Sequence, residues 1–149
     1  MSQHKVRLEW ASAPHAVQPG TYSRDHKVQF SPQSAVQASA AVEYLGNSAF
    51  ADPEQLLVSA LASCHMLVFL AICEGSGYAV ESYIDDAVGE VSKSAEGHPW
   101  VSSITLRPRV IFIGEKQPSR EVLSRMHDRA HRGCFIANSI KSGFALELD

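Results

Sequence analysis

Two cysteines, seventy residues apart, are the side chains of this chain best suited to do chemistry. Cys64 lies inside the most apolar stretch, from Leu56 to Cys73, and Cys134 begins the short segment CFIANS. A thiolate is a nucleophile and a metal ligand, but a buried cysteine is more often an inert, small apolar residue. The residues alone therefore leave two interpretations of Cys64 open, a packing role and a reactive thiol.

Two charged residues favour the reactive interpretation. Arg24 shares one face of the alternating segment 22–30 with apolar residues, so its guanidinium points toward the expected core. A buried guanidinium needs a partner and could hold a thiolate. Glu54 could orient this guanidinium through a bidentate contact. Glu54 precedes Cys64 by ten residues, about 15 Å along a regular helix, so we expect it to act through Arg24 or from a partner subunit.

The other cysteines differ in their expected surroundings. Cys73 follows Cys64 by nine residues, which places it on the opposite helix face about 13.5 Å away. That separation excludes a disulfide between them without unwinding the helix, so we assign Cys73 to packing. Cys134 comes just after Gly133, a helix-stop residue, and we expect it to be mobile.

The composition is that of a globular protein, and we expect one domain spanning residues 1–149. Hydrophobic residues make up 45% of the chain, charged residues 19%, and the net charge is −3. This charge gives no electrostatic reason to expect a nucleic acid or an anionic membrane as a partner. The polar N-terminus MSQHKVRLEW lacks the apolar segment of a signal peptide, which favours a cytoplasmic location and reduced thiols.

The apolar stretch 56–73 reaches the length of a membrane span. Ser59, Ser63 and His65 interrupt it, and no basic flank anchors it, so we expect a central buried helix. A helix that is apolar nearly all round is more than a small domain can bury by itself. We therefore expect a sheet on one side of this helix and a second copy of the chain on the other, in a homodimer.

The order of the expected elements is three strands, a helix, a hairpin, a second helix and a last strand. Asp52 as N-cap, Pro53 at the first helical position and Gln55 in a capping box predict a helix from 53 to about 74. Alternation and turn residues predict strands over 6–10, 22–30, 35–44, 83–93, 101–113 and 144–148, and a helix over 119–132. The fold class is therefore α+β with mainly antiparallel sheet.

Three segments in this order resemble the OsmC/Ohr family, which comprises osmotically inducible and organic-hydroperoxide-resistance thiol peroxidases. They are YSRDH from Tyr22, DPEQLLVSALASCHM from Asp52 and AHRGCFIANSIK from Ala130. The resemblance implies an intertwined homodimer whose sheets wrap central helices, with sites at the subunit interface. It makes Cys64 the peroxidatic thiol and Cys134 the resolving thiol, and Arg24 and Glu54 match the activating pair. His65 and the FIAN sequence look like the OsmC-like branch.

The chemistry that the resemblance implies is the reduction of an organic hydroperoxide to an alcohol. Cys64 would become a sulfenic acid and then form a disulfide with Cys134, which a dithiol reductant such as a lipoyl group would reduce. No metal or other cofactor is required. An apolar environment would favour organic hydroperoxides, and the residues expected to supply it are Leu61, Val68, Phe135 and Ile136.

Two alternatives stay open on the residues themselves. His127 and His131 are four apart on one helix face, and with Cys134 and Cys64–His65 they could supply metal ligands. Histidines on helices are more often surface or capping residues, so we expect no metal. The second alternative is a non-catalytic OsmC-like dimer that binds a ligand in an apolar interface pocket. We expect His26, on the inward strand face, to be a hydrogen-bonded core histidine.

Overall fold

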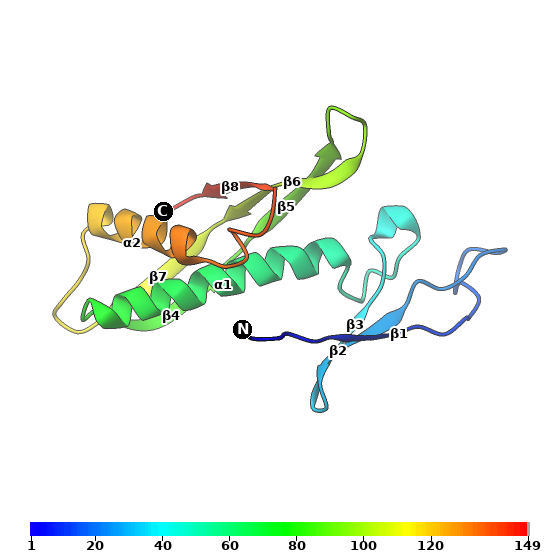
Figure 1. Cartoon of the computed structure of the whole chain (residues 1–149), viewed down its shortest axis with the longest axis horizontal. Coiled ribbons are helices and arrows are strands. Elements are labelled where there is room, and N and C mark those ends of the chain that lie inside the picture. The colour runs from blue at the N-terminus through cyan, green and yellow to red at the C-terminus, as the bar shows by residue number, and fades with distance from the viewer. Residues whose placement is uncertain (149) are drawn as a thin grey trace. The chain divides into compact units, whose positions relative to one another are not determined.

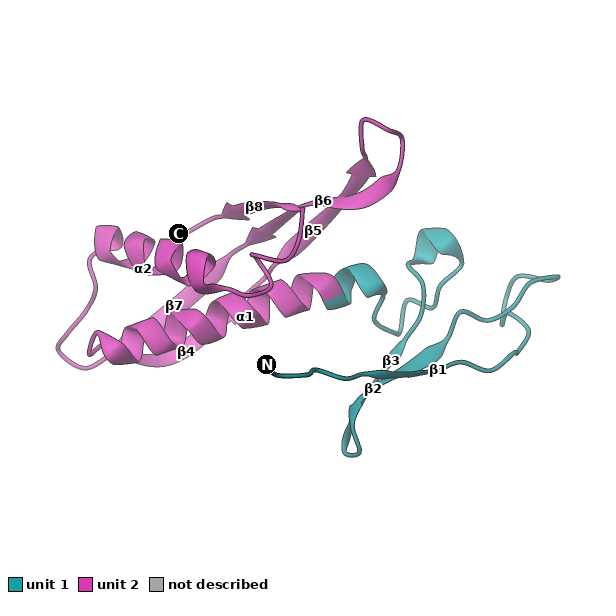
Figure 2. Cartoon of the chain, in the orientation of Figure 1, with its two compact units in different colours: residues 1–56 teal, residues 57–149 magenta. Residues whose placement is uncertain are grey.

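The computed structural model describes residues 1–148 and divides the chain into two compact units, residues 1–56 and residues 57–149 (Figure 2). The first unit holds one antiparallel sheet in the order β1-β2-β3 and a short 3-10 helix, η1. Their bounds are β1 Arg7–Glu9, β2 His26–Ser31, β3 Ser34–Ala38 and η1 Val42–Tyr44 (Figure 1).

Two strands of the first unit differ from the predicted strands by four or more residues at one end. The strand expected from residue 22 begins at His26, which leaves Arg24 in the preceding loop instead of on an inward strand face. The Oγ of Ser23 accepts the N–H of Asp25 at 3.2 Å, and such side-chain bonds to the backbone compete with a strand ladder. The strand expected to reach residue 44 ends at Ala38. There the buried Ser39 accepts the N–H of Asn47 through its hydroxyl at 3.0 Å, which ties the chain into a loop.

Helix α1, Pro53–Gly75, begins and ends close to the predicted residues. The predicted capping box is confirmed, because Asp52 N–H donates to Gln55 Oε1 at 3.0 Å and Gln55 N–H donates to Asp52 Oδ1 at 2.7 Å. At the other end, Gly77 adopts a φ of +74°, a conformation that favours glycine, and the chain turns into the next strand.

The second unit contains the long hairpin that the sequence predicts, in two parts. β4 pairs antiparallel with β7, and β5 pairs antiparallel with β6, while β8 adds to β6 in parallel. The first arm begins at Ala79, four residues earlier than predicted. The elements are β4 Ala79–Asp85, β5 Val88–Lys93, β6 Pro99–Leu106, β7 Pro108–Ile113, α2 Arg120–Gly133 and β8 Gly143–Leu146.

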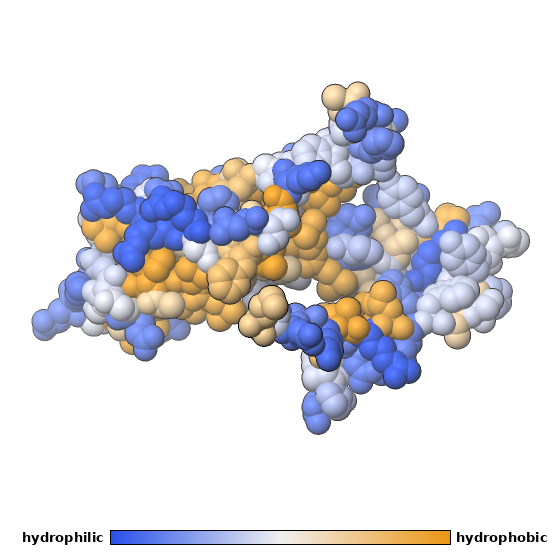
Figure 3. All heavy atoms as spheres, viewed as in Figure 1, coloured by the Kyte–Doolittle hydropathy of each residue, from blue (hydrophilic) through white to orange (hydrophobic). Residues whose placement is uncertain are grey.

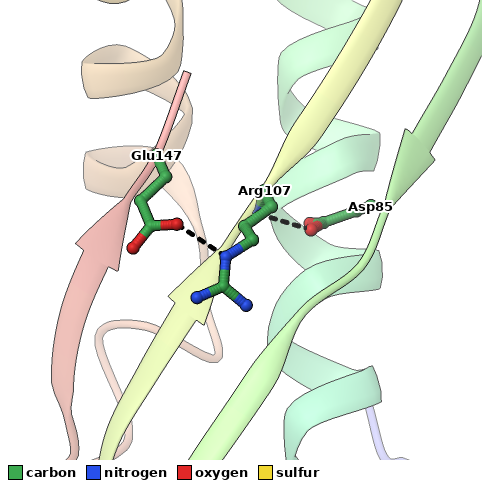
Figure 4. A network of polar contacts seen from close by, with 3 residues as sticks. All are labelled: Asp85, Arg107 and Glu147. Atoms are coloured by element: carbon green, nitrogen blue, oxygen red, sulfur yellow. Dashed lines mark hydrogen bonds and ion pairs between the residues drawn. The ribbon is translucent and has the colours of Figure 1, made fainter. Parts of the chain in front are cut away.

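Arg107 and Asp85 mark the point at which the hairpin divides (Figure 4). The backbone N–H of Arg107 donates to Asp85 Oδ1 at 2.7 Å, so a side chain replaces the ladder partner at this residue. The Arg107 guanidinium donates through Nε to Glu147 Oε2 at 2.6 Å, which ties the end of β8 to the same place. Pro108 follows and cannot donate a ladder hydrogen bond.

Two apolar clusters form the core of the second unit. Phe69 and Cys73 of α1 pack with Met126 and Ala130 of α2 against β4 and β7. The other cluster joins α1 to β6 and to the turn after α2 through Leu61, Ile104, Leu106 and Cys134. Both helices therefore pack against the sheet formed by β4 and β7. The α+β class is confirmed.

Much of the apolar surface of α1 is exposed. It is long and apolar enough to cross a membrane by length and composition, with a mean hydropathy of 2.3, yet only 22% of its apolar window is buried. Leu67 has 60% of its surface exposed, and apolar side chains gather over α1 on the face seen in Figure 3. The core helix of a soluble protein has the same composition, and an exposed apolar strip of this kind marks a surface that needs a cover.

Candidate functional site

The structure brings Cys64 and Cys134 together. Cys64 is half-buried on α1, and Cys134 is fully buried immediately after α2. The two thiols are joined by a hydrogen bond, and burial followed by this bond raises the pKa of Cys134. Both thiols lie in one otherwise apolar cluster, and two neighbouring thiols are the first requirement for a disulfide.

A tight turn fixes Cys134, contrary to the mobile position expected after a glycine stop. Its N–H donates to His131 O at 3.2 Å, and its Sγ accepts the N–H of Ala137 at 3.4 Å. Gly133 allows this turn to approach α1, because a Cβ at that position would lie 3.1 Å from Val68 Cγ1. A side chain at residue 133 would therefore press against Val68, which would have to move by a few tenths of an ångström.

The apolar surroundings of the thiols differ in part from the expected set. Leu61 and Ile136 pack in the cluster that contains both cysteines, as predicted. Val68 packs in the other cluster, between α1 and α2. Phe135 is 81% exposed and gives the thiols no cover within this chain.

Arg24 lies in the first unit and is bound by its own loop. Its guanidinium donates to Thr21 Oγ1 at 3.0 Å and to the carbonyl of Tyr22, and it lies 4.2 Å from the centre of the Tyr22 ring. Within residues 1–148 no ion pair joins it to a carboxylate. Arg24 lines a hollow of about 480 Å³ with Trp10, Tyr22, His26, Ser39, Ala40 and Pro53. His26 is hydrogen-bonded as predicted, to Arg24 O at 2.8 Å, but it is half-buried and not in the core.

Glu54 presents a carboxylate oxygen that lacks a partner. Its Oε2 is buried and has no hydrogen-bond partner among the described residues. An unpaired buried carboxylate is costly unless a cation or donor reaches it. Arg24 and Glu54 belong to the first unit and the two cysteines to the second, so a site made of all four residues stays a prediction.

Two histidines form a contact that the sequence did not reveal. His65 on α1 and His127 on α2 are both fully buried, and Nε2 of His65 shares a hydrogen bond with Nδ1 of His127 at 2.9 Å. Histidines on helices are more often surface or capping residues, but His127 is buried. Burial lowers the pKa of each to about 4, helped at His65 by His131 and at His127 by His65. A histidine inside an apolar run was the available signal, but the pairing crosses two helices and has no local pattern.

The metal alternative finds no support in the described part of the chain. Among residues 1–148, no group of three or more His, Cys, Asp or Glu side chains is arranged to hold a metal ion. Cys73 lies in the other core cluster, as its predicted packing role requires, and burial raises its pKa to about 11.

Comparison with known proteins gives matches in sequence and in fold. A family model described as OsmC-like protein matches residues 46–149. An OsmC-like protein of unknown function from Vibrio cholerae is 40% identical over 100% of both chains, with a TM-score of 0.93. The organic hydroperoxide resistance protein OhrB of Bacillus subtilis is 15% identical over 99% of this chain and 98% of its own, with a TM-score of 0.71. An organic hydroperoxide resistance protein from Elizabethkingia anophelis is 12% identical over 99% and 95%, with a TM-score of 0.69. No curated protein sequence matches the chain.

Proposed function

Since this chain belongs to the OsmC-like protein family, we propose that it is a thiol-dependent peroxidase that reduces organic hydroperoxides to alcohols. The observation that carries the proposal is the hydrogen bond between Cys64 and Cys134, two thiols that are far apart in sequence and share one apolar cluster. Two solved structures of the same fold are named for organic hydroperoxide resistance, which supports the proposal at the level of the fold.

The reaction proceeds in three balanced steps. The Cys64 thiolate attacks the outer oxygen of R–O–O–H, the O–O bond breaks, and an alkoxide leaves and takes a proton to become the alcohol. Cys64 is then a sulfenic acid, S–OH. The sulfur of Cys134 attacks it, an S–S bond forms, and the hydroxide leaves with the Cys134 proton as water. A dithiol such as a lipoyl group restores both thiols and is itself oxidised to a disulfide.

The two cysteines have different surroundings that suit different roles. Cys134 is fully buried, and this burial, together with its hydrogen bond with Cys64, raises its pKa and favours the protonated thiol. Cys64 is the half-buried member of the pair, the one that a peroxide can reach. These differences support Cys64 as the peroxidatic thiol and Cys134 as the resolving thiol.

A homodimer completes the site in this proposal. The exposed apolar surface of α1, including Leu67, would pack against a second copy of the chain. The exposed ring of Phe135 would be buried by the same second copy. The unpaired Oε2 of Glu54 calls for a cation, and Arg24 is the residue we assign to it. Paired in this way, Glu54 would orient Arg24, and Arg24 would hold the Cys64 thiolate. In this proposal the two units belong to one functional domain, and the protein works in the cytoplasm.

The test is a thiol count under anaerobic conditions before and after one equivalent of cumene hydroperoxide. We expect loss of two thiols per chain, with the disulfide mapped between Cys64 and Cys134 and Cys73 still reduced. Cys134→Ser should stop at the sulfenic acid, which dimedone traps. Arg24→Ala should slow the first step about tenfold, because the attacking thiolate loses its proposed cationic partner. Unchanged thiols, or oxidation at Cys73 only, would refute the mechanism.

Leu67→Lys tests the dimer separately. A charge on the exposed strip of α1 meets water in a monomer but is buried without a partner in a dimer packed through α1. We expect the wild-type protein to have the mass of a dimer in light scattering and the variant to shift toward a monomer. Lys5→Glu, at the exposed N-terminus, is the control for a change of charge. A wild-type monomer would remove the second copy from the proposal.

A further inference from the structure

The buried pair of His65 and His127 connects the two segments that carry the reactive thiols. His65 is the residue next to Cys64 on α1, and His127 precedes Cys134 by seven residues, two turns of α2. Their hydrogen bond, Nε2 to Nδ1 at 2.9 Å, therefore links α1 to α2 at the residue after Cys64 on α1 and two turns before Cys134 on α2. The proposed peroxidase mechanism assigns no role to either imidazole.

Aromatic rings enclose this pair on several sides. The two imidazoles are nearly parallel, at 5°, with centres 5.3 Å apart. Phe69 stacks on His127 at 4.1 Å, and Phe144 of β8 lies 5.9 Å from His65 and 3.8 Å from His131. Tyr83 of β4 contacts the far side of Phe69. His131 and Tyr83 are the titratable members of this aromatic cluster among the described residues, and neither is an anion at neutral pH.

The hydrogen bond between the imidazoles needs one donor and one acceptor, and it forms only in one register of α2 against α1. Two neutral imidazoles can share only one proton in this geometry, so one donates and the other accepts. Their remaining nitrogens, Nδ1 of His65 and Nε2 of His127, are buried without a partner among the described residues. If α2 slid or turned against α1, the last hydrogen bond would also break and four nitrogens would be left unpaired. A single buried polar contact of this kind can fix the register of packed helices.

We propose that the His65–His127 pair is a positioning device that sets α2 against α1 so that the thiol of Cys134 meets that of Cys64. Gly133 lets the end of α2 lie close to α1. The imidazole hydrogen bond sets the register of α2 along α1, and so which turn of α2 lies opposite Cys64. The pair acts through the helices, since no hydrogen bond joins either imidazole to a thiol within residues 1–148. Its role in turnover rests on the proposed peroxidase function, but its effect on the Cys64–Cys134 disulfide does not.

The disulfide equilibrium in glutathione buffers tests the proposal without any peroxide. One oxidised glutathione takes two electrons from the two thiols and yields the protein disulfide and two reduced glutathiones. His127→Phe keeps a flat ring against Phe69 but removes the hydrogen bond. We expect it to lower the equilibrium constant for the disulfide about tenfold, a shift of about 30 mV for a two-electron couple. His127→Asn places an amide where Nδ1 was and should stay within threefold of wild type.

Two further variants separate positioning from a general loss of stability. Val110→Ala removes packing volume from β7 in the same unit and should leave the disulfide constant unchanged. His65→Phe breaks the same hydrogen bond from α1, and the double variant with His127→Phe should change the constant no more than either single variant. The proposal is overturned if His127→Phe equals wild type, if His127→Asn fails to restore the constant, or if Val110→Ala shifts it equally.

Peroxide then distinguishes the two proposals. In a single turnover with cumene hydroperoxide, the imidazole variants should form the Cys64 sulfenic acid at the wild-type rate and close the disulfide about tenfold more slowly. Failure of wild-type protein to react with the peroxide would refute the peroxidase and leave the glutathione result standing. An equal closing rate in wild type and His127→Phe would refute the positioning role alone.

Discussion

Acid should destabilise this protein through the same two histidines. The ordinary pKa of a histidine is 6.5, and burial lowers that of His65 and His127 to about 4 in the folded chain. Between these values the unfolded chain binds protons that the folded chain does not, so the free energy of unfolding falls as the pH falls. The contribution is fully present above about pH 6.5 and is lost progressively toward pH 4.

The size of the effect follows from the shift. For one imidazole moved from 6.5 to about 4, lowering the pH from 7 to 5 costs about 2 kcal/mol of unfolding free energy. The two imidazoles share one hydrogen bond and repel each other when charged, so we expect a total of about 2 to 4 kcal/mol for the pair. This is a large share of the stability of a typical domain.

Urea unfolding followed by far-UV circular dichroism at pH 7 and pH 5, at one protein concentration, measures this loss. The comparison is with His65→Leu/His127→Leu, which keeps the other five histidines, so their titration cancels. Asp85 also cancels; burial raises its pKa, so it opposes acid destabilisation in both proteins. At pH 7 the double variant should be as stable as wild type or more so, because two unpaired buried nitrogens disappear. Equal pH dependence in the two proteins would refute the reasoning.

Two further predictions concern packing in the second unit. Gly89→Ala should lower the free energy of unfolding by about 1 to 3 kcal/mol, measured by urea unfolding, because its Cβ would lie 2.5 Å from Val58 Cγ2. Adding Val58→Ala to the same chain removes this clash and should recover most of the loss. Tyr83→Phe should leave the unfolding free energy unchanged or raise it by up to about 1 kcal/mol, since the buried hydroxyl has no partner among residues 1–148. A clear loss of stability would mean that this hydroxyl does have a hydrogen-bond partner, such as an ordered water.

The sequence predicted those elements whose signals are local. The capping box of Asp52 and Gln55 and the glycine at 77 define α1 within a few residues, because both act on the nearest turn of the chain. The long hairpin was also predictable from alternation and turn residues. Its division was not, because the carboxylate of Asp85 captures the N–H of a residue twenty-two positions away.

Non-local contacts explain the remaining differences. Alternation placed Arg24 on an inward strand face, but its loop binds the guanidinium through Thr21 and Tyr22 instead. The glycine before Cys134 suggested mobility, whereas the turn after it holds the thiol through the N–H of Ala137. Neither outcome has a periodic signal, since each depends on the partners that a polar group finds after folding.

The contrast between the two polar contacts of α1 bears on how the chain could work. The thiol contact of Cys64 with Cys134 breaks and re-forms in each proposed cycle, because the disulfide must close and then be reduced. The imidazole contact of His65 with His127 involves no bond that changes, so it can keep the helices in place through both states. Cys134, the proposed resolving thiol, is fully buried and cannot rely on mobility to find its partner. In the proposed cycle the closing of the disulfide therefore depends on how well α2 is held, and His65, the residue after Cys64 on α1, is one of the two residues to which we assign this role.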